Sequence, residues 1–68
     1  MSKEELKQIV SDATGVGCEV EANQVNREFV VRTNCNYIGV TDLCKIMSRA
    51  ELLKVASEGG QITLLFTF

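Results

Sequence analysis

The sequence predicts a small α+β domain in which two helices cover one face of a three-stranded, mainly antiparallel sheet. Three observations lead to this fold class: an apolar stripe at helical spacing near the start, segments that alternate apolar and polar residues, and a second helical stripe before the last such segment. The expected order is helix, strand, strand, helix, strand, arranged as a two-layer open-faced sandwich. We take residues 1–68 as one domain, with the other face of the sheet toward solvent.

The first helix is expected over residues 3–14. Its apolar positions recur at i, i+3, i+4 and i+7, which places them on one helix face. These positions are Leu6, Ile9, Val10 and Ala13. Ser2 with Glu5 three residues later forms a capping-box pattern at the helix start. Gly15 stands where a left-handed residue commonly ends a helix.

Residues 18–22 and 27–33 are expected to form an antiparallel hairpin. Both segments alternate, and their inward apolar positions are Cys18, Val20, Ala22, Phe29 and Val31. The Asn-Gln-Val-Asn segment at 23–26 makes the turn, because asparagine tolerates left-handed backbone. Pairing Ala22 with Arg27 then unites the apolar side chains on one face of the hairpin.

The second helix is expected to begin at Thr41 or Asp42 and to end at the glycine pair 59–60. Its inward positions would be Leu43, Ile46, Met47, Ala50 and Leu53. Ser48 with Glu51 repeats a capping-box pattern, so a break near Ser48 into a short and a longer helix is the alternative. We favour a single helix because the apolar stripe continues through this point.

Residues 61–68 are expected to form the last strand. One face carries Ile62, Leu64, Phe66 and Phe68, and the other carries Thr63, Leu65 and Thr67. Leu65 and Val30 are therefore apolar residues on the outer face of the sheet.

Composition excludes several function classes. Nine acidic and seven basic residues give a net charge of −2, which argues against a dedicated binder of nucleic-acid backbones. The chain contains no histidine, the commonest general base and a common metal ligand. Three cysteines without a C-x-x-C pair argue against a disulfide framework or a zinc site, and we interpret them as reduced thiols. A charged N-terminus is not a signal peptide, and no apolar run approaches the roughly 20 residues of a membrane helix. We expect a cytoplasmic protein without catalytic residues, cofactor, metal, nucleic acid or membrane partner.

Over residues 5–68 the chain resembles the phosphocarrier protein HPr family with its first strand removed. The stretches that carry the resemblance are the two hairpin strands, Val-Thr-Asp-Leu-Cys-Lys-Ile-Met at 40–47 and Gly-Gly-Gln-Ile-Thr-Leu at 59–64. The family's phosphorylated histidine has no counterpart, and Asp42 falls at its regulatory serine. Phosphocarrier activity is therefore excluded. The resemblance implies that the missing strand would lie at an edge, beside the final strand.

If that sheet order holds, residues 61–68 form an exposed apolar edge that pairs with another chain. The alternative is an internal strand that only builds the core. Candidate interaction residues on this strand and the outer face are Gln61, Thr63, Leu65, Thr67, Phe68, Val30 and Arg32. A second candidate contact is the loop formed by Asn34, Cys35, Asn36 and Tyr37. Glu19, Glu21 and Glu28 could form an acidic patch, although we favour an ordinary solvated face.

These observations favour a non-enzymatic protein-interaction module, a small regulator or inhibitor of a larger cellular machine. The alternatives are a structural homo-oligomer, dimeric through edge strands, and a degenerate HPr-like regulator without phosphotransfer. The expected partner is another protein or a second copy of the chain.

Overall fold

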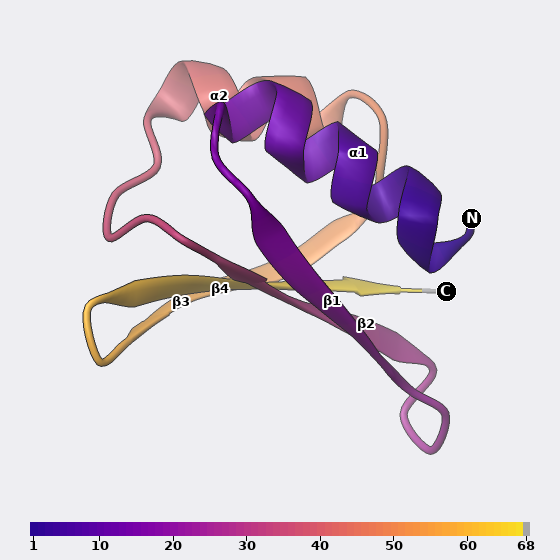
Figure 1. The fold of residues 1–68 in the computed structure, drawn as a ribbon. Helices are drawn as coiled ribbons and strands as arrows, with labels where there is room; N and C mark the ends of the chain where they lie inside the picture. Colours follow the sequence, from indigo (N-terminus) through magenta and orange to yellow (C-terminus); the bar gives the residue numbers. More distant parts are fainter. Residues whose placement is uncertain (68) are drawn as a thin grey trace.

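The computed structural model describes residues 1–67, which form two helices and a four-stranded antiparallel sheet. The elements are α1 (Lys3–Thr14), β1 (Cys18–Asn23), β2 (Glu28–Thr33), α2 (Val40–Met47), β3 (Leu52–Glu58) and β4 (Gln61–Thr67). Both helices lie on the same side of the sheet (Figure 1). The α+β class is confirmed, but the sheet has one strand more than expected.

The first helix has the predicted bounds and both predicted ends. The Ser2 hydroxyl accepts the Glu5 N–H at 3.1 Å, and the Glu5 carboxylate accepts the Ser2 N–H at 3.4 Å. Gly15 ends the helix with φ of 75°, a left-handed conformation that costs glycine little. Leu6, Ile9 and Val10 are buried. The stripe read from the sequence is therefore the face that contacts the sheet.

The first hairpin forms with the predicted inward face but with a register shifted by two residues. Ala22 pairs with Phe29, not with Arg27. The Asn23 side chain accepts the N–H groups of Val25 and Asn26, and Arg27 takes a positive φ of 54°. The loop therefore closes over residues 24–27, one position later than expected. A shift of two residues leaves every side chain on its predicted face, because the side-chain period is two.

The expected long second helix is wrong: α2 ends at Met47, and residues 52–58 form β3. Ser48 ends the helix, since its N–H bonds the Cys44 carbonyl and its hydroxyl donates to the Lys45 carbonyl at 2.8 Å. The alternative located the break correctly but predicted a helix after it. Met47 and Leu53, expected inward, are 60% and 51% exposed.

The expected edge position of the last strand is also wrong. The sheet order is β1-β2-β4-β3, so β4 pairs with β2 on one side and with β3 on the other. The edge position beside β4, left empty in the HPr-like arrangement, is taken by β3. Phe68 lies outside the described residues.

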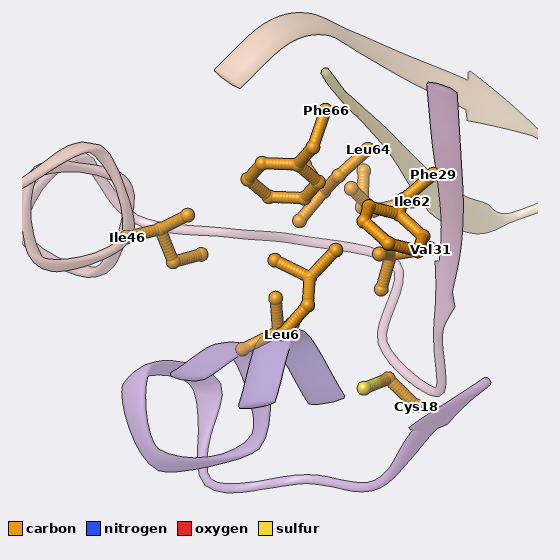
Figure 2. Close-up of a cluster of buried hydrophobic side chains, with 9 residues drawn as sticks. Leu6, Cys18, Phe29, Val31, Ile46, Ile62, Leu64 and Phe66 are labelled. Atoms are coloured by element: carbon orange, nitrogen blue, oxygen red, sulfur yellow. The ribbon is translucent and has the colours of Figure 1, made fainter. Parts of the chain in front are cut away.

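The core lies between the helices and the sheet. Leu6 of α1 and Ile46 of α2 point toward Phe66 and Leu64 of β4, with Phe29 of β2 beside them (Figure 2). The buried cluster comprises Leu6, Val10, Cys18, Phe29, Val31, Ile46, Ile62, Leu64 and Phe66. Burial of this apolar surface is the main favourable term in the folding of so short a chain.

Candidate interaction surface

The sheet face opposite the helices carries a row of side chains from all four strands. Glu21 pairs with Val30, Val30 with Leu65, and Leu65 with Lys54. The two apolar residues at the centre are half-buried, and the charged residues at the ends are exposed. A depression of about 170 Å³ lies over this face, lined by Val30, Arg32, Lys54, Ala56, Glu58, Thr63 and Leu65.

Most of the predicted interaction residues lie on this outer face, but not at an edge. Val30 and Arg32 of β2 pair with Leu65 and Thr63 of β4. The backbones of Gln61, Thr63 and Leu65 also pair with β3. These residues therefore offer only side chains to a partner, because their backbone groups are already used within the sheet.

The predicted acidic residues share the outer face of the sheet with Arg32. Glu21 accepts a hydrogen bond from the Arg32 guanidinium at 3.0 Å, a diagonal pair across β1 and β2. Both side chains are exposed, so the pair contributes little to stability. Glu19 lies opposite Arg32 in the ladder, and Glu28 pairs with Asn23 and Thr67.

The loop after β2 is joined to β4 by hydrogen bonds. The Cys35 carbonyl accepts the Ile62 N–H at 3.0 Å, and the buried Thr33 hydroxyl donates to the Ile62 carbonyl at 3.0 Å. An open pocket of about 390 Å³ is lined by Thr33, Asn34, Cys35, Asn36, Gly60 and Gln61. Three of the four predicted loop residues meet there, whereas Tyr37 is 76% exposed and lies outside the lining.

The free edge of the sheet on this side is β3, which the sequence reading did not identify as a strand. Gly59 and Gly60 have φ of 57° and 79°, as in a two-residue type I′ turn. In such a turn the flanking residues Glu58 and Gln61, which are paired here, form a hydrogen-bonded pair. This pair determines which residues of β3 form hydrogen-bonded pairs with β4 over residues 54–58.

The backbone groups of Val55 and Ser57 point away from β4. Hydrogen-bonded and non-hydrogen-bonded pairs alternate along an antiparallel ladder. Ser57 pairs with Ile62, whose N–H goes to Cys35 on the β2 side, and Val55 pairs with Leu64 two residues further along. Outside the helices and strand ladders, no backbone hydrogen bond of the described residues involves residues 51–58. The outward groups of β3 are therefore directed at solvent.

Two apolar side chains of β3 are partly exposed. Leu53, at an irregularity in the pairing, is 51% exposed, and Val55 is 42% exposed although it shares a face with the core residues. The helices cover the sheet unevenly: α1 contacts β1, and α2 lies alongside α1. The β3 edge is consequently the part of the inner face that is least covered.

The α2 helix adds to this exposed apolar area. Lys45 and Arg49 line a groove against α1. At about 100° per residue, Val40 and Met47 lie on the opposite side of α2, and they are 77% and 60% exposed. This side of α2 therefore faces away from α1.

The residues of this edge, Leu52–Glu58, were predicted to be helical. Two signals could have found them. The segment alternates, with Lys54, Ala56 and Glu58 on one side, and Gly-Gly between two alternating runs is a strong hairpin signal.

Within residues 1–67 no group of His, Cys, Asp or Glu side chains is arranged to hold a metal ion. Neither described helix has the length and apolar character needed to cross a membrane. Comparison of the chain with protein-family models, with curated proteins and with solved structures finds no match.

Proposed function

We propose that this chain is a non-enzymatic protein-interaction module that binds an extended segment of another protein chain by strand addition at β3. The observation that carries the proposal is the free edge itself, where the backbone groups of Val55 and Ser57 point to solvent. An added strand would supply the partners that these groups lack. A small regulator that docks on a larger protein is the setting that suits such a module.

The side chains of β3 define the chemistry of the partner. On the outer face Lys54, Ala56 and Glu58 follow one another at alternate positions. An antiparallel partner therefore fits best with a basic residue opposite Glu58, a small residue opposite Ala56 and an acidic residue opposite Lys54. Read from its own N-terminus, the preferred partner has the pattern basic, any, small, any, acidic.

The helix side of the added strand would meet apolar surface. Val55 is partly exposed there, and an apolar partner side chain would remove this area from water. Backbone hydrogen bonds would supply affinity, and the alternating side chains would supply selectivity.

A displayed library of extended peptides tests the proposal. Wild-type protein should select peptides with the pattern above, and binding should slow hydrogen exchange at the Val55 and Ser57 amides. Ser57→Pro should bind these peptides at least tenfold more weakly, because it removes the outward N–H and leaves the β3–β4 ladder intact.

Ser57→Thr is the matched control, since it keeps the N–H and should bind like the wild type. Equal binding by Ser57→Pro and Ser57→Thr, with both variants folded, would place the interaction elsewhere on the molecule.

A further inference from the structure

We infer that the strand added at β3 is the β3 strand of a second copy of this chain, paired antiparallel about a two-fold axis at Ala56. The inference rests on the proposed function, because it names the partner of the same edge. The partner pattern derived above, basic, any, small, any, acidic, is the sequence Lys54-Val55-Ala56-Ser57-Glu58 itself. The edge is therefore complementary to its own copy.

Charge selects one register of this pairing. With the axis at Ala56, Lys54 of each copy lies opposite Glu58 of the other, which gives two attractive pairs on the outer face. An axis at Val55 places Lys54 opposite Ala56. An axis at Ser57 places Lys54 opposite Gly60. Of these three registers, only the one centred on Ala56 pairs both charges.

Backbone hydrogen bonding is compatible with this register, as it is with the other two, so charge alone distinguishes them. Val55 and Ser57 are the residues whose N–H and C=O groups point outward. With the axis at Ala56, Val55 of one copy is directly opposite Ser57 of the other, and the two can exchange both hydrogen bonds. Lys54 and Glu58 then form non-hydrogen-bonded pairs, in which cross-strand side chains approach most closely.

Apolar surface would be buried on the helix side of the same interface. Val55 of each copy lies beside the axis and is 42% exposed. A second copy would cover the exposed Val55 side chains beside the axis and extend the sheet of the fold.

The assembly would stop at two copies. Its sheet would have eight strands, with β1 at both outer edges. On β1 the outer-face residues include Glu19 and Glu21. Two-fold pairing of β1 with its axis at Glu19, Val20 or Glu21 sets carboxylate against carboxylate, which opposes further growth.

Two single charge reversals and their mixture test the register. Lys54→Glu and Glu58→Lys each convert both attractive pairs into repulsive ones, so each should raise the dissociation constant of the dimer roughly 30-fold. In an equimolar mixture the introduced glutamate faces the introduced lysine, and native Lys54 faces native Glu58. The mixture should therefore form a heterodimer about as tight as the wild-type homodimer.

The measurement is sedimentation equilibrium of wild type, each variant and the mixture over about 1 µM to 1 mM. Both positions are exposed, so both variants are expected to fold, and circular dichroism checks this. A wild type that stays monomeric over this range overturns the inference. It is equally overturned by variants that dimerise like the wild type, or by a mixture that stays monomeric.

The outcome also separates this inference from the proposed function. A monomeric wild type that binds displayed peptides, with loss of binding in Ser57→Pro, retains strand addition and removes only the second copy as partner. If neither a peptide nor a second copy slows hydrogen exchange at the Val55 and Ser57 amides, both the proposed function and this inference are overturned.

Discussion

The two free edges of the sheet, β1 and β3, differ in cover and in charge. The β1 strand lies under α1, and its inward Cys18 is 4% exposed. The inward Val55 of β3 is 42% exposed. On the outer face β1 carries acidic residues at alternate positions, whereas β3 carries Lys54 and Glu58 with Ala56 between them.

In the proposed pairing, the charge pattern of an edge decides whether it can pair with itself. Charged side chains on an edge strand ordinarily discourage association. Residues of the same sign achieve this in every nearby register of β1. Opposite signs four residues apart, as in Lys54 and Glu58, instead attract a second copy in one register. Apolar content, which pointed to residues 61–68, identified an interior strand.

The largest expected effect concerns the unequal cover by the helices. Leu6→Ala removes a side chain of α1 that is fully buried over the sheet, and it should lower the free energy of unfolding by about 2–5 kcal/mol. Met47→Ala, on the exposed side of α2, should cost the monomer under about 0.5 kcal/mol. Urea unfolding of both variants in a Lys54→Glu background measures monomer stability alone. Similar costs for the two substitutions would contradict the difference in cover.

The hairpin that builds the β3 edge should be sensitive to its turn. Gly60 has φ of 79°, and a Cβ there would meet no atom within 4 Å, so any cost arises in the backbone. Gly60→Val should destabilise the fold by about 1–2 kcal/mol, because a β-branched residue disfavours left-handed backbone. Gly60→Asn should cost clearly less, since asparagine tolerates this region. Thermal unfolding compares the two, and equal losses would contradict the type I′ turn.

Changing one charge on β1 should make that edge resemble β3. Glu19→Lys places a lysine opposite Glu21 of a second copy in the register centred on Val20, at both symmetric positions. A chain with two self-complementary edges should form species larger than a dimer as concentration rises, which light scattering detects as increasing average mass. Glu19→Gln is the control and should remain like the wild type. An unchanged mass for Glu19→Lys would show that α1, not charge, closes this edge.

The smallest expected effect is that of the ion pair beside the β1 edge. Glu21→Gln removes the carboxylate charge that meets Arg32 at 3.0 Å, between two exposed side chains. The loss in unfolding free energy should be under about 0.5 kcal/mol and should shrink with added salt. Urea unfolding at low and high salt measures it. A loss above about 1 kcal/mol would mean that this pair is a structural support of β1.

Local sequence patterns predicted the first half of the molecule well. The capping box of Ser2 and Glu5 and the alternation of β1 and β2 act over a few residues, and each is present as predicted. The register of the first hairpin was missed by two residues, because the Asn23 side chain bonds two backbone N–H groups and moves the loop. The register of this hairpin therefore depends on one side chain and not on the alternation of the strands.

The second half could not be assigned from local pattern alone. Residues 52–58 contain apolar positions compatible both with a helical stripe and with alternation. These residues form a strand because they pair with the edge of β4 that β2 leaves open. The candidate site therefore moved from residues 61–68 to residues 52–58, while the outer-face residues Val30, Arg32, Thr63 and Leu65 were placed on the predicted face.

By itself the sequence determined the α+β class, the first helix and its ends, and the inward face of the first hairpin and of β4. These features follow from short-range periodicity and capping, which act within one element. The tertiary structure decided that residues 52–58 are a strand and that this strand, not the last one, is at the edge. Strand order is set by which distant segments satisfy one another's backbone hydrogen bonds, and that competition is not encoded within a single element.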